Sequence, residues 1–270
     1  MKTQLLERYP ILTNLYFDFE KSHDSSSGIQ FANDHPFIPV GLVLCYMLSC
    51  YCGQKYMANR KPFDLRMPLA SWNLALSLFS FVGMLRTVPH LLHNLYTMTL
   101  SHNLCTDPKT TFGDGATGLW VQLFIFSKIP ELVDTFFIVA RKKPLLFLHW
   151  YHHVTVLLFC WHSYATEAST GLFFVAMNYS VHAMMYGYYY LMAIDSKPKW
   201  LNPSLITACQ IMQMVVGSSL CLLSYSLLGD NCAVKKENVI AGGIMYGSYL
   251  YLFCEFAVKR FMTKNIKRIE

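Results

Sequence analysis

The sequence RKKPLLFLHWYHHVTVLLFCWHSY, residues 141–164, is the most informative segment of the chain. Three histidines, His149, His152 and His153, lie within an apolar run that is long enough to form a transmembrane helix. On a helix with about 100° between successive residues, the three share one face. Titratable side chains are costly inside a membrane and usually face the interior of a helix bundle. The cluster therefore predicts a functional site within such a bundle.

The composition is that of a membrane protein. Of the 270 residues, 54% are hydrophobic and 14% are charged, whereas soluble domains carry about 25% charged residues. We expect an all-α, polytopic membrane fold with one seven-helix domain over residues 37–260, a polar N-terminal segment, 1–36, and a basic tail, 261–270. The predicted transmembrane spans are residues 37–57, 67–88, 117–139, 145–164, 170–192, 203–228 and 238–259.

Lysine and arginine residues are unevenly distributed among the loops. They gather in the loops that follow the first, third and fifth spans and after the seventh span, and they are sparse in the other loops. Because cytoplasmic loops carry an excess of these residues, we expect a cytosolic C-terminus and an N-terminus on the far side of the membrane. The net charge of +6 then comes from short loops beside the membrane and does not indicate nucleic-acid binding.

Two of the nine cysteines, Cys105 and Cys232, fall in predicted loops on the far side of the membrane. If that side is an oxidising lumen, a disulfide between them is expected. The other cysteines fall in the predicted spans, where cysteine packs as a small hydrophobic residue.

Polar side chains of four predicted helices lie at a similar depth, ~8 to ~16 Å from the cytosolic helix ends at 1.5 Å per residue. Beyond this depth each helix becomes apolar again. The layout fits an amphiphilic ligand, with a polar centre, an apolar tunnel behind it and a basic mouth that includes Arg141 and Lys142. The residues expected in the centre are Lys128, Glu131, Asp134, His149, His152, His153, Asn178, His182, Tyr186, Tyr189, Gln210 and Gln213.

Two enzymatic interpretations of the histidine cluster remain open. In one, the histidines bind iron, as in membrane desaturases and hydroxylases, although the histidines at this depth are too few to fill two metal shells. In the other, one imidazole attacks a thioester to form an acyl-imidazole, and a carboxylate of Glu131 or Asp134 orients an imidazole. A malonyl thioester would then lose carbon dioxide, and its carbanion would take up the acyl group. A transporter or receptor is a third hypothesis.

Four motifs occur in an order that resembles one known family. They are KxxELxDT from Lys128, HxxHH from His149, NxxVHxxMYxYY from Asn178 and TxxQxxQ from Thr207. Together they resemble the ELO family of very-long-chain fatty acid elongases, the 3-ketoacyl-CoA synthases of the endoplasmic reticulum. The resemblance covers roughly residues 35–265.

The resemblance implies seven helices that enclose an acyl tunnel, and the condensation of a long-chain acyl-CoA with malonyl-CoA without a metal or another cofactor. It implies that His152 carries the acyl group beside His182, with His149 and His153 in support. In this scheme Glu131 and Asp134 orient imidazoles and Lys128 balances their charge. The partners implied are the two CoA substrates, membrane lipid, and the reductases and dehydratase of the elongation cycle, with a homodimer as a further expectation.

The resemblance also places the chain in the endoplasmic reticulum membrane, with a lumenal N-terminus and a cytosolic C-terminus. Trp150 makes the HxxHH box similar to that of members acting on saturated and monounsaturated chains. The sequence gives no acyl chain length, because the floor of a tunnel cannot be located from spacing along one dimension.

Overall fold

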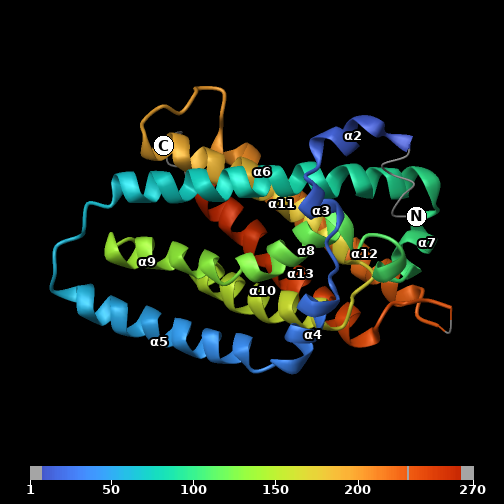
Figure 1. The fold of residues 1–270 in the computed structure, drawn as a ribbon. Coiled ribbons are helices and arrows are strands. Elements are labelled where there is room, and N and C mark those ends of the chain that lie inside the picture. The colour runs from blue at the N-terminus through green and yellow to red at the C-terminus, as the bar shows by residue number, and fades with distance from the viewer. Residues whose placement is uncertain (1–7, 230, 263–270) are drawn as a thin grey trace.

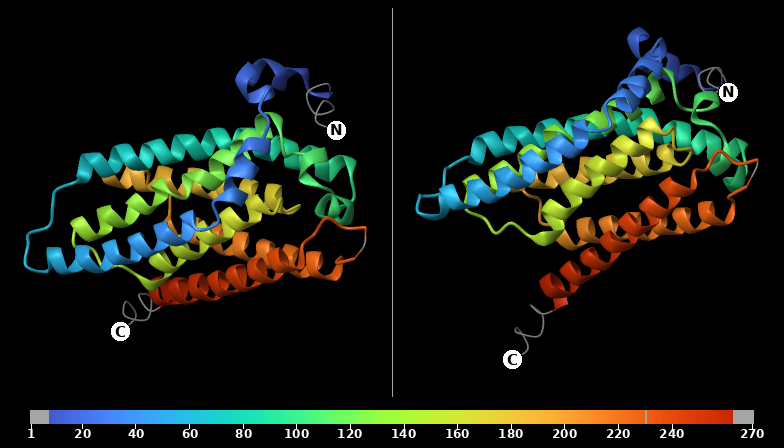
Figure 2. Two further views of the ribbon diagram at one scale, coloured as in Figure 1. Left: turned by 60° about the horizontal axis from the view of Figure 1, so that its bottom comes forward. Right: turned by 90° about the horizontal axis from the view of Figure 1, so that it is seen from below.

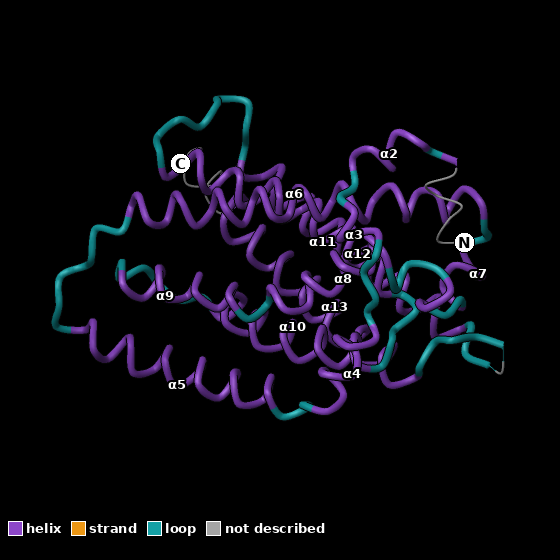
Figure 3. Tube along the Cα trace, viewed as in Figure 1, coloured by secondary structure: helices purple, strands orange, loops and turns teal. Residues whose placement is uncertain are grey.

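The computed structural model describes residues 8–229 and 231–262, which form helices and loops with no strand among them (Figure 3). Short helices precede and separate the long ones. Most of the predicted tail, residues 261–270, lies outside the described part of the chain. The elements are α2 (Pro10–Leu15), α3 (Asp18–Lys21), α4 (Ser26–Asp34), α5 (Ile38–Ala58), α6 (Arg66–Thr97), α7 (Leu100–Cys105), η1 (Pro108–Thr110), α8 (Gly115–Ser127), η2 (Pro130–Leu132), α9 (Val133–Ala140), α10 (Phe147–Ala165), α11 (Gly171–Ala193), α12 (Pro203–Ser226), α13 (Lys236–Ala257) and η3 (Val258–Met262).

The long helices run along a common direction, so the bundle has two ends (Figures 1 and 2). The basic end holds the loops 59–65, 141–146 and 194–202, and the disulfide end holds α7 and the loop between α12 and α13. Helix α6 packs along α11, and α12 packs along α13. These two pairs, with α8, α9 and α10, surround the interior of the bundle.

Helical structure occurs over each of the seven predicted spans. Within the part of the chain that the structure describes, three segments are long and apolar enough to cross a membrane, namely Arg66–Thr97, Pro203–Ser226 and Lys236–Arg260. A fourth is added if α4 and α5, which are bent by 65° relative to each other, count as one span. The structure thus establishes an all-helical fold with several membrane-type helices, and the count of seven spans stays a prediction.

The predicted span 117–139 is not one continuous helix. Helix α8 ends at Ser127, a 3-10 turn covers Pro130–Leu132, and α9 begins at Val133. Proline has no backbone N–H to donate, and its ring clashes with the carbonyl one turn earlier, so Pro130 interrupts the helix. The interruption lies at the level of the buried polar residues described below.

Helix α6 is longer than the sequence predicts. The predicted span ends at residue 88, but the helix continues through Pro89 to Thr97. Its last turns are packed, because His90 and His93 are buried and Nδ1 of His90 is 2.8 Å from Oγ1 of Thr117 in α8. Tertiary packing therefore sustains the helix beyond a proline that removes one backbone hydrogen bond.

A buried ion pair attaches the N-terminal segment to the bundle. Nε of Arg86 in α6 is 3.0 Å from Oε1 of Glu20, and both side chains are buried. Nε1 of Trp120 donates to the same carboxylate at 2.7 Å, and the backbone N–H of Phe17 donates at 2.9 Å. Burial alone would raise the pKa of Glu20, but the hydrogen bonds from these three partners outweigh it and hold that pKa below its usual value. The charged carboxylate thus joins α3 to α6 and α8.

Helices α6 and α11 approach each other closely at Gly83. A Cβ atom at this position would lie 2.4 Å from Cζ of Tyr179 in α11, so only glycine permits the contact. The hydroxyl of Tyr179 donates to the backbone carbonyl of Trp120 at 2.9 Å. These contacts set the position of the part of α11 that carries Asn178 and His182.

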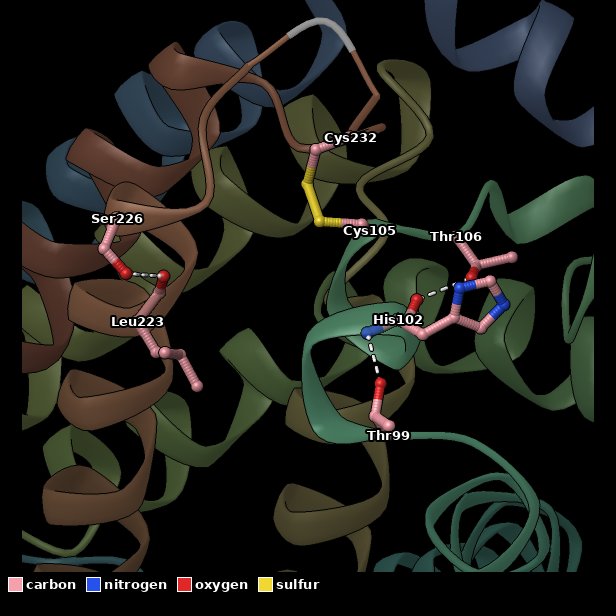
Figure 4. Close-up of a disulfide and its surroundings, with 7 residues drawn as sticks. All are labelled: Thr99, His102, Cys105, Thr106, Leu223, Ser226 and Cys232. Atoms are coloured by element: carbon pink, nitrogen blue, oxygen red, sulfur yellow. Dashed lines mark hydrogen bonds between the residues drawn. A yellow bond between two sulfur atoms is a disulfide. The ribbon is translucent and has the colours of Figure 1, made fainter.

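Cys105 and Cys232, the pair expected from the sequence, are joined by a disulfide (Figure 4). The bond connects the end of α7 to the loop between α12 and α13, and the N–H of Ala233 donates to the carbonyl of Cys105 at 2.8 Å. Because 127 positions separate the two cysteines, the bond restricts a long loop of the unfolded chain.

The double substitution Cys105→Ser/Cys232→Ser is expected to lower the free energy of unfolding by on the order of 2–4 kcal/mol, because it releases this loop. Thermal unfolding of the purified protein in detergent measures the effect. Cys45→Ser, which alters an exposed free cysteine, is the matched control. A double variant as stable as this control would contradict the expectation.

Candidate active site

A cavity of about 740 Å³ lies in the half of the bundle nearer the basic end. Helices α6, α9, α10, α11, α12 and α13 contribute to its wall. It extends from the half-exposed Arg66 at the basic end to buried residues such as His153 in the interior. Eleven of the residues predicted for the polar centre line it, namely Glu131, Asp134, His149, His152, His153, Asn178, His182, Tyr186, Tyr189, Gln210 and Gln213.

His149 is oriented by hydroxyl groups rather than by a carboxylate. Its Nε2 atom is 2.9 Å from Oγ1 of Thr135 in α9, and that hydroxyl is 2.7 Å from the phenol oxygen of Tyr46 in α5. The centre of the His149 ring lies 4.5 Å from that of His153, which is 5.6 Å from that of His152. The three rings therefore form one continuous cluster on α10.

A buried lysine connects α8 to α11. Lys128 is 2% exposed, and its Nζ atom donates to Oε1 of Glu131 at 2.7 Å and to Oδ1 of Asn178 at 3.5 Å. The ammonium group also lies over the ring of Phe124, 4.0 Å from its centre. Lys128 does not line the cavity, but it holds two residues that do. A buried charge needs such partners, because removal from water is costly.

The lysine determines which way the side-chain amide of Asn178 points. Its oxygen faces the Lys128 ammonium, so its NH₂ group faces His182, where Nδ2 is 3.2 Å from Nε2. Because an amide N–H donates, Nε2 of His182 is the acceptor and Nδ1 carries the proton. The tautomer of His182 thus follows from the position of a charge on another helix.

Asp134 has different partners from those expected from the sequence. Its Oδ1 atom accepts from Nε1 of Trp72 at 2.6 Å, and its Oδ2 atom accepts from the hydroxyl of Tyr186 at 2.7 Å. Within residues 8–229 and 231–262, no imidazole donates to this carboxylate. Asp134 therefore positions Tyr186, whose ring centre lies 5.4 Å from that of His182. Sequence reasoning missed Trp72, since nothing in its local pattern marks it.

His152 and His153 share one property, since neither imidazole has a hydrogen-bond partner among the described residues. The backbone carbonyl of His152 accepts from the hydroxyl of Tyr249 at 3.2 Å, and the ring centres of these two residues are 5.1 Å apart. The ring of His152 lines the cavity, so its nitrogens are available to a bound molecule.

Basic side chains surround the outer part of the cavity. Arg66, Arg141 and Lys143 line it, and Arg66 is paired with Asp195. Lys142, which the sequence groups with Arg141, does not line it. Its ammonium group instead donates to the carbonyls of residues 58 and 60, at 2.9 and 3.0 Å, and so joins two loops of the basic end.

The fold and this site define a class of protein, a helical membrane protein with a histidine-centred cavity inside the bundle. Residues 31–268 match the family described as ELO: GNS1/SUR4 family. The chain belongs to this family.

Proteins with established names match most of the chain. It is 42% identical over 222 residues to "Very long chain fatty acid elongase 6" of Drosophila melanogaster, covering 81% of this chain and 70% of that protein. It is 38% identical over 261 residues to the Gallus gallus protein of the same name, covering 95% and 97%. It is 39% identical over 280 residues to "Fatty acid elongase 3" of Trypanosoma cruzi, covering 93% and 91%.

The ion pair of Lys128 and Glu131 gives a test of the site's architecture. Lys128→Met is expected to cost about 3–5 kcal/mol of stability, because it leaves a buried carboxylate without its cation. The double variant Lys128→Met/Glu131→Gln is expected to recover part of this loss. Thermal unfolding in detergent compares them, with Lys259→Met, in an exposed ion pair, as the control that leaves the melting temperature unchanged. If Lys128→Met were as stable as Lys128→Met/Glu131→Gln, the buried ion pair would not be the reason for the loss.

Proposed function

We propose that this chain is the condensing enzyme of fatty acid elongation, which joins a long-chain acyl-CoA to malonyl-CoA and yields a 3-oxoacyl-CoA, free CoA and carbon dioxide. Membership of the ELO family and the names of its relatives support the proposal. Residues from its four motifs also line one cavity. The observation that carries the mechanism is that two imidazoles of the HxxHH motif, those of His152 and His153, line the cavity without a hydrogen-bond partner among the described residues. The choice of His152 as the nucleophile follows the family resemblance.

In the first half-reaction, a nitrogen of neutral His152 attacks the thioester carbonyl of the acyl-CoA. The carbon–sulfur bond breaks, and the CoA thiolate takes the proton that the imidazole loses, which leaves an acyl-imidazole and free CoA. In the second half-reaction, malonyl-CoA loses carbon dioxide and its carbanion attacks the acyl carbonyl. The carbon–nitrogen bond breaks, and the imidazole regains a proton from solvent.

His182 is assigned to the transfer of protons beside this centre. Because Asn178 occupies its Nε2 atom, Nδ1 is the nitrogen that can donate to a substrate oxygen or sulfur. Glu131 and Lys128 act through Asn178, since Glu131 accepts from Lys128, and Lys128 donates to the Asn178 amide rather than to the imidazole. His149 and His153 support the cluster from the side facing α5.

The basic residues at the mouth are assigned to the phosphates of CoA. Arg66, Arg141 and Lys143 line the cavity there, and guanidinium groups suit phosphate recognition. Lys142 contributes to the same charge from outside the cavity wall. Between the mouth and the histidines, the lining residues Tyr186, Tyr189, Gln210 and Gln213 are placed to contact the pantetheine arm.

The expected surroundings of the enzyme follow from the same proposal. Seven transmembrane spans, a lumenal N-terminus and a cytosolic C-terminus agree with the concentration of basic residues at one end of the bundle. The disulfide at the other end is of the kind that forms in an oxidising lumen. We assign the chain to the endoplasmic reticulum membrane, with the reductases and dehydratase of the elongation cycle and a second copy of the chain as candidate partners.

The oxidative alternative, a metal-dependent desaturase or hydroxylase, has no feature in its favour. Among the described residues, no group of three or more histidine, cysteine, aspartate or glutamate side chains is arranged to hold a metal ion. The relatives are named as elongases.

Substitution of the proposed nucleophile tests the function. His152→Ala is expected to lower the rate of condensation by at least about a thousandfold, because no acyl-imidazole can form. His162→Ala, at an exposed histidine near the other end of α10, is the matched control and is expected to retain activity. The assay follows release of radiolabelled carbon dioxide from malonyl-CoA in the presence of acyl-CoA.

Condensation at the control rate by a folded His152→Ala variant would refute the nucleophile. Absence of carbon dioxide and CoA release from the unaltered protein would favour a transporter or receptor instead.

A further inference from the structure

The cavity ends at the level of the histidines. On α10, α11 and α12, the lining residues nearest the disulfide end are His153, Asn178 and Met214. Within residues 8–229 and 231–262, no lining residue on these helices lies farther toward the disulfide end. The apolar tunnel expected from the sequence is therefore closed in this structure. An acyl chain whose thioester reaches His152 from the basic end must displace side chains if its tail continues in the same direction.

A cluster of apolar and aromatic side chains lies directly beyond the cavity floor, and we call it the plug. Met214 belongs to both the cavity wall and this cluster, so the two adjoin. The plug is contributed by α10, α11, α12 and α13. Its buried residues are Met214, Cys221, Met245, Tyr246 and Tyr249, and the partly buried Tyr151, Phe159, Phe174, Leu250 and Phe253 pack against them.

Tyr246 occupies the centre of the plug. Its ring stacks on that of Phe174, with the ring centres 4.8 Å apart. On its other side it covers Gly217, where a Cβ atom would lie 2.4 Å from the ring. Gln213 of α12 lines the cavity floor. Gly217 is one turn beyond Gln213 along α12, about 6 Å deeper.

A second apolar core also lies beside the histidines, but it offers no comparable path for the acyl tail. The cluster around α4, α8, α10 and α11 is held by hydrogen bonds of its large aromatic residues to the backbone. Nε1 of Trp161 donates to the carbonyl of Ala32 at 3.0 Å, and Tyr179 donates to that of Trp120 at 2.9 Å. No described residue of this second core lines the cavity, whereas Met214 and Phe253 belong to both the cavity wall and the plug cluster. The plug is therefore the core that the cavity opens onto.

We propose that the acyl tail enters the plug between α11 and the α12–α13 pair, and that Tyr246, held over Gly217, stops it and so sets the longest acyl chain that the enzyme accepts. The inference rests on the proposed condensing activity and deepens it. The tail passes Gln213 and Met214, displaces the methionine, and meets the ring one helical turn farther on. A chain two carbons longer than this limit collides with a ring that has no free space behind it, because Gly217 and Phe174 enclose it.

The test is a panel of saturated acyl-CoAs that differ by two carbons, assayed with malonyl-CoA. For the unaltered enzyme, the panel defines the longest chain that is condensed. The quantity compared is the kcat/KM for the acyl-CoA two carbons beyond this limit, divided by the kcat/KM for the longest acyl-CoA that the unaltered enzyme condenses. Tyr246→Ala is expected to raise this ratio by about tenfold or more, since misfit of one or two methylene groups has an effect of this size. Tyr251→Ala is the matched control, because it removes an exposed tyrosine from the same helix.

The outcomes separate this inference from the proposed function. If the unaltered protein condenses no acyl-CoA, the function itself fails. If it is active and a folded Tyr246→Ala variant keeps the same ratio as Tyr251→Ala, the role of Tyr246 is overturned. Tyr246→Leu, which leaves a smaller void, provides the same comparison if the alanine variant does not fold. An unchanged ratio in that variant overturns the inference equally.

Discussion

The ammonium group of Lys128, buried between a carboxylate and an amide, is the charge on which the arrangement of the site depends. Isolated in an apolar interior it would be strongly unfavourable, so the bundle must supply Glu131 and Asn178 as partners. The contact with Asn178 connects α11 to the end of α8. It also fixes the orientation of the Asn178 amide, and through it the tautomer of His182. One buried charge thus links the packing of helices to the protonation of a residue in the active site.

The helix is interrupted at Pro130, in the middle of this arrangement. Glu131, within the 3-10 turn at Pro130–Leu132, pairs with Lys128, whereas Asp134, in the first turn of α9, reaches Trp72 and Tyr186. The carboxylates therefore have separate tasks. Glu131 neutralises the lysine, and Asp134 holds one wall of the cavity.

Much of the site could be predicted from the sequence, because its members lie at helical spacings within single segments. His149 and His153 are one turn apart on α10, and Asn178 and His182 are one turn apart on α11, so each pair shares a face whatever the neighbours are. Partners from other segments could not be predicted in this way. Trp72 and Asp134 are separated by 62 positions, and no local pattern connects them.

The same distinction applies to the helix boundaries. Pro89 is a signal for a helix end, yet α6 continues because packing around His90 supports the turns beyond it. Pro130 carries the same signal, and there the helix does break. Two identical residues have opposite outcomes, and at Pro89 the packing of the buried turns beyond it offsets the lost backbone hydrogen bond.

The sequence by itself determined the helical membrane class, the set of polar residues in the bundle interior and the identity of the cysteines at the end opposite the basic loops. These properties follow from hydrophobic content, from helical periodicity and from the distribution of charge among loops, all of which are local or compositional. Only the tertiary structure decided which carboxylate meets which donor, how Lys142 is used, and where the cavity ends. Those features depend on distances between segments remote in the chain, and such distances are set by close packing of the whole bundle.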